Sequence, residues 1–451
     1  MEKRLIVIQV VMLVLLQPAL PQNVISLEEC YQAAIRTNTV SKEKDTYNEI
    51  WKLRDENLAK GWLPTLDANA SLVYNSEVVD MSGAFASIPV PGFADAIKPL
   101  PHEQYKVTVD VNQVLYDGGA IKGARAVEKA GLDVNRQQTE TDLYKLRGQV
   151  NGYYFSILIL DKQKELLESY HELISRRLAS MNSAFDNGII LRSDIDVLNA
   201  EKIKLEQQIE ENSIMKASVI RNLSGLTGIL IDSGTNLALP SVAEGHSSEL
   251  SRPELKLFDL KMEQLDAGLN LIQSKRMPKA FGFATIGYGN PPGSNFFRDE
   301  FAPYYIIGAG IKWNIFDWNK AKNEKQQLMM QKEIVENRRE DLSESLQRLL
   351  ESKDAEIKSL ESMINKDSDL IGLRKKITAT AESQYDNGTI TATEYLNEIN
   401  SEKQAMINHE IHKISLLMAM VEYLNISGED LVPESPGKVF GEYAESLSGN
   451  N

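Results

Sequence analysis

The sequence holds a single cysteine, Cys30, so no disulfide bond can form within the chain. The residues before it, Ser26-Leu27-Glu28-Glu29, are mostly polar or acidic, unlike the small-residue lipidation site of bacterial lipoproteins, and we expect a packed, unreactive thiol. Positive charge is also scarce, with 49 Lys and Arg against 64 Asp and Glu and a net charge of -15. Because binding phosphates requires clustered Lys and Arg, this balance argues against a nucleic-acid partner.

The patterns of a catalytic or cofactor site are missing as well. His409 and His412 lie three residues apart in a helical pattern and could hold a metal, but Glu410-Ile411 between them does not give zinc-protease spacing. We expect these histidines to be solvated helix residues. Gly118-Gly119 favours a strand-to-helix bend and Gly287-Tyr288-Gly289 a strand end, rather than a phosphate-binding loop. We therefore expect no enzyme activity, no cofactor and no metal.

Proline is absent from two long stretches, residues 102–239 and 304–432. Prolines cluster instead near 89–101, 240–253 and 291–303 and again at 433–436. Because proline ends helices, these clusters mark the limits of two long helical regions.

The N-terminus is typical of a secretory signal peptide. Lys3-Arg4 precede the largely apolar run from Leu5 to Leu16, and a segment with small residues and prolines follows up to Gln22. The run is too short to be a spanning helix, and no later segment approaches the roughly 18 consecutive apolar residues that one needs. The alternative is a buried N-terminal helix. We expect an exported protein that loses residues 1–22.

Two halves of the chain correspond at an offset of 200 positions. Three landmarks recur in the same register, which indicates an internal repeat. They are Leu115-Tyr116-Asp117-Gly118-Gly119 with Ile315-Phe316-Asp317-Trp318-Asn319, Phe185-Asp186-Asn187-Gly188 with Tyr385-Asp386-Asn387-Gly388, and Leu226-Thr227-Gly228 with Ile426-Ser427-Gly428. Since Asn and Gly tolerate positive φ, the chain can reverse at the middle landmark. We expect the tips of two helical hairpins there.

Apolar residues in the long regions recur at alternating steps of three and four, which is typical of coiled-coil packing. In the first repeat one helix is expected from Gly118 to Phe185, which would span about 100 Å. Shorter return helices are expected from Leu191 to Leu226 and from Thr391 to Ile426. Such long helices must pack against other long helices.

Before each outgoing helix the period changes to two, which predicts strands over about 66–75, 104–115, 280–289 and 304–315. Each has the length of a tilted transmembrane strand, with one apolar face and one face of small or polar groups. In the third strand Phe281, Phe283 and Thr285 are expected to share the apolar face, in a weaker alternation than that of the other strands. A soluble sheet packed on a core would alternate in the same way. The export signal and the lack of other predicted strands nearby favour transmembrane strands over a soluble sheet. Because four strands cannot close a barrel, copies of the chain must pool their strands.

With this order of elements the chain resembles the TolC-like outer-membrane efflux proteins of Gram-negative bacteria, over essentially its whole mature length. The resemblance implies an α+β fold of two repeats, each a transmembrane β-hairpin with a long coiled-coil helical hairpin. Three copies would form one twelve-stranded β-barrel, continued by an α-helical tunnel through the periplasm. The family acts as a passive exit duct for efflux or type I secretion of small molecules or proteins. A periplasmic adaptor protein and an inner-membrane transporter of the RND or ABC class are the implied partners.

The resemblance also implies roles for the hairpin tips. Asp194 and Glu394, six positions beyond the tip glycines, would form an acidic periplasmic gate, although Asn397 stands where some members carry a further Asp. The alternative is that both acids cap their helices. The adaptor-docking residues would be Asp186, Asn187, Gly188, Ile189, Ile190, Leu191, Arg192, Asp386, Asn387, Gly388, Thr389, Ile390, Thr391 and Ala392.

The expected domain organisation runs in order along the chain. It comprises a signal peptide at 1–22, N-terminal tunnel helices at 23–65, a first strand hairpin at 66–115, a first helical hairpin at 116–228 with its tip at 186–193, an equatorial segment at 229–252, a helix at 253–277, a second strand hairpin at 278–315, a second helical hairpin at 316–428 with its tip at 386–393, and an equatorial or disordered tail at 429–451. The rival function is an exported coiled-coil structural or adaptor protein without a pore.

Overall fold

The computed structural model describes residues 24–79, 100–186, 190–232, 234–242, 249–295 and 298–431. The expected signal peptide and residues 432–451 of the expected tail lie outside these ranges. The chain divides into two compact units, one formed by Met1–Glu43, Gln138–Lys256 and Glu340–Asn451, the other by Lys44–Gln137 and Leu257–Arg339. None of the helices built from the described residues has an apolar stretch long enough to cross a lipid bilayer.

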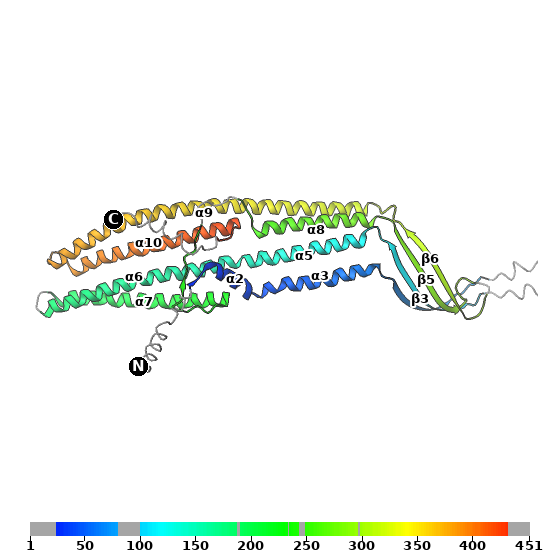
Figure 1. The fold of residues 1–451 in the computed structure, drawn as a ribbon, viewed down its shortest axis with the longest axis horizontal. Helices are drawn as coiled ribbons and strands as arrows, with labels where there is room; N and C mark the ends of the chain where they lie inside the picture. The colour runs from blue at the N-terminus through cyan, green and yellow to red at the C-terminus, as the bar shows by residue number, and fades with distance from the viewer. Residues whose placement is uncertain are drawn as a thin grey trace, which may run out of the picture. The chain divides into compact units, whose positions relative to one another are not determined.

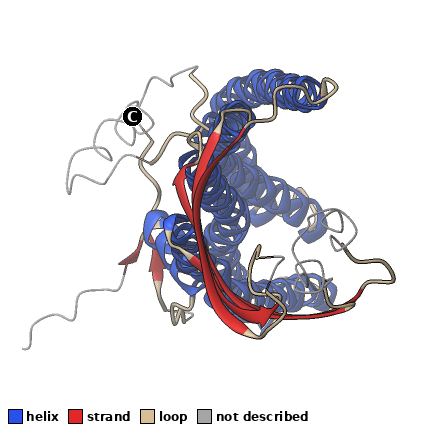
Figure 2. Cartoon of the chain, turned by 90° about the vertical axis from the view of Figure 1, so that its right-hand side faces the viewer, coloured by secondary structure: helices blue, strands red, loops and turns tan. Residues whose placement is uncertain are grey.

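The second unit contains a four-stranded antiparallel sheet in the order β2-β3-β5-β6. Its strands are β2 (Thr65–Tyr74), β3 (Glu103–Tyr116), β5 (Lys279–Asn290) and β6 (Ala302–Lys312) (Figure 1). β2 pairs with β3 and β5 with β6 as hairpins, and the long β3–β5 ladder joins the two hairpins side by side. Figure 2 shows that the sheet is strongly curved. β6 ends at Lys312, three residues before the end of the expected strand.

Four helices flank the sheet in sequence. They are α3 (Glu43–Ala59), which continues as the 3-10 turn η2 (Lys60–Trp62), α5 (Ala120–Tyr144), α8 (Pro253–Lys275) and the first half of α9 (Lys320–Asp386). Exposed ion pairs join neighbouring helices within this unit. Arg125 of α5 contacts Asp55 of α3 at 2.7 Å, and Lys332 of α9 contacts Asp266 of α8 at 2.8 Å.

The first unit contains two long helical hairpins, drawn in Figure 1. One consists of α6 (Leu146–Asp186) and α7 (Arg192–Thr227), the other of the second half of α9 with α10 (Ala392–Ser427). α9 is a single helix of 67 residues, which corresponds to about 100 Å. The single helix expected from 118 to 185 is instead two helices, α5 and α6, with a turn at Lys145 between them. Buried side chains of α6, α7, α9 and α10 form one core near the hairpin tips.

Short elements complete the first unit. α2 (Leu27–Thr37) begins with a capping box, in which Ser26 and Glu29 each accept a hydrogen bond from the other's backbone N–H. It is followed by η1 (Thr39–Lys42). Two-residue strands β1 (Val24–Ile25) and β4 (Asn236–Leu237) pair in parallel, so part of the expected equatorial segment is tied to the start of the described chain. Cys30 is buried in the core that α2 forms with α6, α7 and α10.

Candidate functional site

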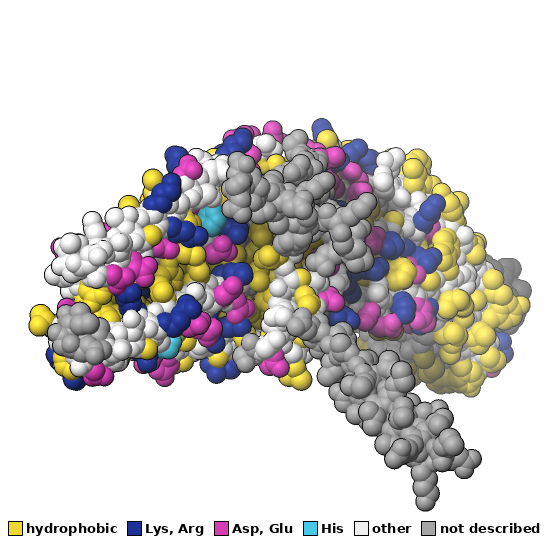
Figure 3. All heavy atoms as spheres, turned by 60° about the vertical axis from the view of Figure 1, so that its left-hand side comes forward, with side chains coloured by type: hydrophobic (Ala, Val, Ile, Leu, Met, Phe, Trp, Pro, Cys, Tyr) yellow, Lys and Arg dark blue, Asp and Glu magenta, His cyan; other side chains and the backbone are white. Residues whose placement is uncertain are grey.

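The two faces of the sheet differ sharply in chemistry. The strand registers place on one face the side chains Leu66, Leu72, Val107, Val109, Ile286, Tyr288, Tyr305, Ile307 and Ile311, all of which are exposed. In Figure 3 hydrophobic side chains gather over the strands. An exposed apolar surface of this extent marks an interaction with lipid or with another protein.

The opposite face is polar. It carries Asp67 and Asn69 on β2, Lys106, Thr108, Asp110 and Asn112 on β3, and Thr285 on β5. Asp110 lies at its centre and accepts hydrogen bonds from Thr285 Oγ1 at 2.5 Å and Asn69 Nδ2 at 2.8 Å. A shallow hollow of about 480 Å³ lies on this face around Asp67 and Asp110. A face of this composition is suited to line water.

The expected placement of Phe281 and Phe283 was wrong. Phe283 pairs with Asn112 and therefore lies on the polar face, and the apolar face of β5 is formed by Ala284, Ile286 and their neighbours. The rings lie over glycines of β6, because a Cβ built on Gly308 would meet the Phe283 ring at 2.4 Å and one on Gly310 the Phe281 ring at 2.7 Å. Aromatic rings that cover glycines of a neighbouring strand protect an otherwise bare backbone.

The sheet has two open edges. Among the described residues, β2 pairs only with β3 and β6 pairs only with β5. An open edge with an apolar face cannot be left in lipid, since its backbone groups would lack hydrogen-bond partners. In lipid, a sheet with these two edges would need further strands to pair with them.

The second hairpin tip closes through a Schellman motif at the expected Asp-Asn-Gly turn. Gly388 has a φ of +70°, and its N–H donates to the carbonyl of Tyr385 at 2.9 Å. The N–H of Thr389 donates to the carbonyl of Gln384 at 2.9 Å. These two bonds satisfy carbonyls at the end of α9 and reverse the chain. At the first tip, Asn187, Gly188 and Ile189 lie outside the described residues.

Both acids of the expected gate cap helices. The Asp194 carboxylate accepts from the N–H of Leu191 at 3.3 Å, and Glu394 accepts from the N–H of Thr391 at 2.8 Å and from its hydroxyl at 3.0 Å. These bonds from Thr391, the backbone one first, lower the pKa of Glu394. Glu394 and Asn397 are exposed and Asp194 is partly exposed. Both carboxylates therefore have the capping role within the protomer.

The expected docking residues differ in accessibility within the protomer. Asp186, Leu191, Arg192, Asp386, Asn387, Gly388, Thr389 and Thr391 are exposed. Ile190 and Ile390 pack partly against the tip core. Ala392 is buried, so its side chain does not reach the surface.

Arg177 of α6 is a tip residue that the sequence did not reveal. Its side chain is 16% exposed and forms ion pairs with Asp386 and with Glu382, both on α9. Its guanidinium carbon also lies 5.3 and 5.4 Å from the ring centroids of Tyr385 and Tyr395, which stack on one another. A cation held by two carboxylates and two rings fixes the first hairpin against the second. No local pattern predicts it, because its partners lie about 200 positions away.

A second bond between the hairpins joins α7 to α10. Lys403 Nζ lies 3.3 Å from Glu201 Oε1, and both side chains are largely buried. Burial lowers the pKa of Lys403, and the adjacent Glu201 carboxylate opposes that shift. Lys204 lies 3.6 Å from the other Glu201 oxygen.

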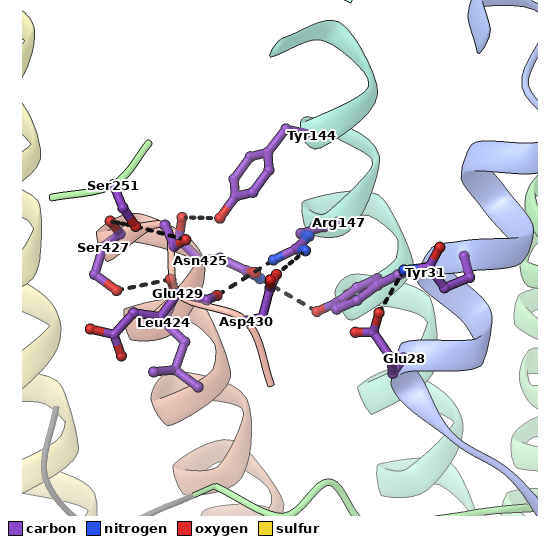
Figure 4. A network of polar contacts seen from close by, with 12 residues as sticks. Glu28, Tyr31, Tyr144, Arg147, Ser251, Leu424, Asn425, Ser427, Glu429 and Asp430 are labelled. Atoms are coloured by element: carbon purple, nitrogen blue, oxygen red, sulfur yellow. Dashed lines mark hydrogen bonds and ion pairs between the residues drawn. The ribbon is translucent and has the colours of Figure 1, made fainter. Parts of the chain in front are cut away.

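A polar network holds the end of α10 (Figure 4). Arg147 lies 5.2 Å from the Tyr31 ring centroid and 4.7 Å from that of Tyr144, and it pairs with Asp430 just beyond α10. The Tyr144 hydroxyl donates to the carbonyl of Asn425 at 2.9 Å. The turn at Lys145 thus lies between two side chains that clamp α10. These groups are engaged with one another, which fits a structural role.

His409 and His412 are not solvated as expected. Both are largely shielded, and His412 Nδ1 lies 2.6 Å from Asp367 Oδ2 on α9. Burial is the main cause that lowers the pKa of His409, and Lys413 adds to it. Among the described residues, no group of three or more His, Cys, Asp and Glu side chains is arranged to hold a metal ion.

Comparison with known families adds an independent observation. A family model described as "Outer membrane efflux protein" matches residues 58–228, which run from the end of α3 to the end of α7. No curated protein sequence matches the chain.

Solved structures of membrane proteins share the fold. CusC matches with a TM-score of 0.66 at 12% identity, covering 90% of this chain and 92% of its own. VceC of Vibrio cholerae matches with a TM-score of 0.62 at 13% identity, covering 88% and 96%. MtrE of Neisseria gonorrhoeae, an outer-membrane channel in an open state, matches with a TM-score of 0.62 at 14% identity, covering 89% of each chain.

Proposed function

We propose that this chain is a TolC-like outer-membrane efflux protein and forms a trimeric exit duct through the outer membrane. As a member of that family it would lie in the cell outer membrane of a Gram-negative bacterium, with its helices in the periplasm. Its proposed role is that of a channel and not of an enzyme. The duct is passive, so an inner-membrane transporter of the RND or ABC class supplies the energy and a periplasmic adaptor links the two.

One observation carries this proposal: the four-stranded sheet with one apolar face, one polar face and two open edges. Three copies supply twelve strands, close the edges, turn the apolar face to lipid and turn the polar face to a water-filled lumen. The helical hairpins then line the periplasmic part of the duct.

Membrane fractionation tests the duct against its rival. Salt-washed outer membranes should retain the protein, and a mild-detergent extract should give a complex of three chains by native mass spectrometry. Recovery as a soluble periplasmic monomer would instead favour an exported coiled-coil protein without a pore.

The gate role of Asp194 and Glu394 remains part of the proposal. Three copies would bring six carboxylates to the tunnel end, where their negative charges repel one another and attract cations. Asp194→Asn with Glu394→Gln removes the charge but keeps an oxygen that can cap the helix. We expect weaker cation preference in planar bilayers. Unchanged selectivity would leave these acids with capping alone.

Adaptor docking at the tips is tested by charge introduction. Leu191→Glu and Thr389→Glu place acids on exposed tip positions, and both should reduce co-purification of the adaptor. Leu230→Glu, which alters an exposed position outside the tips, is the matched control. Equal recovery of the adaptor with all three variants would remove docking from these tips.

A further inference from the structure

The two strand-to-helix junctions of the chain share one backbone design. After β3, the Asp117 carboxylate accepts from the N–H of Ile121 at 2.5 Å, and after β6 the Asp317 carboxylate accepts from the N–H of Ala321 at 3.0 Å. Two residues in the left-handed region follow each Asp, with φ of +72° and +86° at 118–119 and +53° and +66° at 318–319. The same turn is therefore built twice.

The side chains at these turns differ. The first turn has Gly118 and Gly119, whereas the second has Trp318 and Asn319. A bulky residue at positive φ has a strained backbone. Glycine would avoid this strain, so the tryptophan must contribute something that the isolated chain does not show.

The first turn has a partner within the chain. A Cβ built on Gly118 would lie 2.5 Å from Met277 Cβ and 3.0 Å from the carbonyl oxygen of Ser274, at the end of α8. Gly118 is required there because the second repeat packs directly against it. Trp318 is 83% exposed among the described residues, and its ring packs edge-on against that of Phe316, at 4.8 Å between ring centroids.

The chain also holds a counterpart of the Met277 turn. The N–H of Met277 donates to the carbonyl of Ser274 at 3.1 Å, and the N–H of Leu63 donates to that of Lys60 at 2.8 Å. A proline and then a strand follow each of the two residues. Met277 packs against Gly118 and is 44% exposed, whereas Leu63 is 59% exposed, although its turn contacts Ile121 through Gly61.

Strand-end hydrogen bonds support the same correspondence. Gln113 donates to the carbonyl of Trp62 at 2.5 Å, and Trp313, 200 positions after Gln113, donates to that of Arg276 at 3.2 Å. Trp62 and Arg276 each come directly before the counterpart residues Leu63 and Met277. The Lys60–Leu63 turn before β2 is therefore the equivalent of the Ser274–Met277 turn before β5.

We propose that Trp318 of one copy packs against the Lys60–Leu63 turn of the neighbouring copy and sets the spacing between them. This rests on the proposed trimer, in which β6 of one chain meets β2 of the next. The junction within the chain is its template, because it joins the equivalent elements through Gly118 and Met277. The template also shows that the junction between copies is wider, since a tryptophan Cβ in the place of Gly118 would collide with its partner.

Register gives a second consequence. In the internal repeat, β6 is equivalent to β3 at an offset of 200 positions, and β5 is equivalent to β2 at an offset of 214, counted from Pro64 and Pro278 before the strands. Within the chain Val111 of β3 pairs with Ala284 of β5. The equivalent pair between copies is Ile311 with Ala70. Both lie on the apolar face, so this register keeps that face continuous from chain to chain.

Photo-cross-linking in the full-length trimer tests the contact. Trp318→p-benzoylphenylalanine keeps an aromatic side chain, and irradiation should give dimer and trimer bands whose cross-linked peptide contains Lys60–Leu63. Cross-links only to lipid or within one chain would overturn the contact. Native mass spectrometry of the unirradiated sample reports separately whether the trimer, and hence the proposed function, stands.

A matched pair of glycine variants tests the energetics. Trp318→Gly and Asn319→Gly relieve the same kind of backbone strain, but only the first removes the ring. On dilution in mild detergent, Trp318→Gly should dissociate at a protein concentration about ten-fold higher than wild type, as for an interface tryptophan. The Asn319→Gly trimer should dissociate at the same protein concentration as wild type or at a lower one. Equal trimer stability in both variants would overturn the proposal.

Discussion

Lys403 Nζ lies 3.3 Å from Glu201 Oε1 at the interface of α10 and α7, where the two side chains are only 7% and 10% exposed. This pair joins the return helices of the two hairpins within one chain. A buried charge is costly unless it is paired, so the bond matters most when one partner is removed.

Removing either partner should have unequal effects. Glu201→Gln leaves Lys403 buried without a carboxylate and should lower the free energy of unfolding by about 3 kcal/mol. Lys403→Met should cost less, because Lys204 remains 3.6 Å from Glu201. The double variant should regain most of the loss, as measured by denaturant unfolding in mild detergent with a double-mutant cycle. Strictly additive losses would contradict a coupled pair.

The same Glu201→Gln variant should show a characteristic pH dependence. Burial lowers the pKa of Lys403 in the folded state. Between this lowered pKa and the ordinary lysine value the unfolded chain binds more protons, so stability rises with pH. Because the Glu201 carboxylate opposes the shift, its removal lowers the pKa of Lys403 further in the variant. The difference in free energy of unfolding between wild type and the variant should therefore become smaller toward pH 10.

Arg177 should control how tightly the hairpin tips are held. Arg177→Gln removes the ion pairs to Asp386 and Glu382 and the contacts with two tyrosine rings. We expect a loss of about 2 kcal/mol in stability and a larger single-channel conductance. Arg192→Gln is the control, because that arginine is well exposed and should matter by less than about 0.5 kcal/mol. Identical conductance of both variants would show that Arg177 does not control the width of the duct at the hairpin tips.

Glu394 should stabilise the start of α10 in a pH-dependent way. Its pKa is lowered by bonds from the backbone and hydroxyl of Thr391. Its contribution is therefore present above the ordinary glutamate pKa and is lost as the pH falls through the lowered value. Hydrogen exchange of the first turn of α10 should be faster in Glu394→Gln than in wild type at pH 7, and the difference should shrink as the pH falls below the ordinary glutamate pKa. The exposed Glu361→Gln serves as the control, and a difference that does not change with pH would exclude a charge effect.

Cys30 should be unreactive in the folded protein. Burial, with a smaller effect of Glu29, raises its pKa to about 12, and its side chain is fully buried. A maleimide at pH 8 should therefore label the thiol only after denaturation. Rapid labelling of the native protein would show that the core around α2 opens.

The sequence predicted features with a strong local period or turn chemistry. The alternation in β2, β3 and β6 predicted the faces that the registers show, and the Asn-Gly pair predicted the turn at Gly388. The faces of β5 were misjudged, because Phe281 and Phe283 cover glycines of β6 that are invisible to a pattern read along one strand.

Other features depend on partners far away in the sequence. In the sequence nothing distinguishes Arg177 from the other arginines. Its partners are carboxylates of α9 and tyrosine rings of α9 and α10, which only the fold brings next to it. The break at Lys145 has no proline near it, and Gly148 follows it inside α6 rather than standing at the break. The break coincides with contacts of Tyr144 and Arg147 to the end of α10. The strands β1 and β4 have two residues each, too few to show a period.

Conductance is the most direct test of the central claim, that three copies enclose a water-filled passage. Single-channel recording in planar bilayers should be made on the purified wild-type trimer and on Arg177→Gln, so that a closed tip does not conceal the pore. The account predicts discrete conductance steps, larger in the variant. Bilayers that remain silent with both proteins, although the trimers have inserted, would contradict a duct.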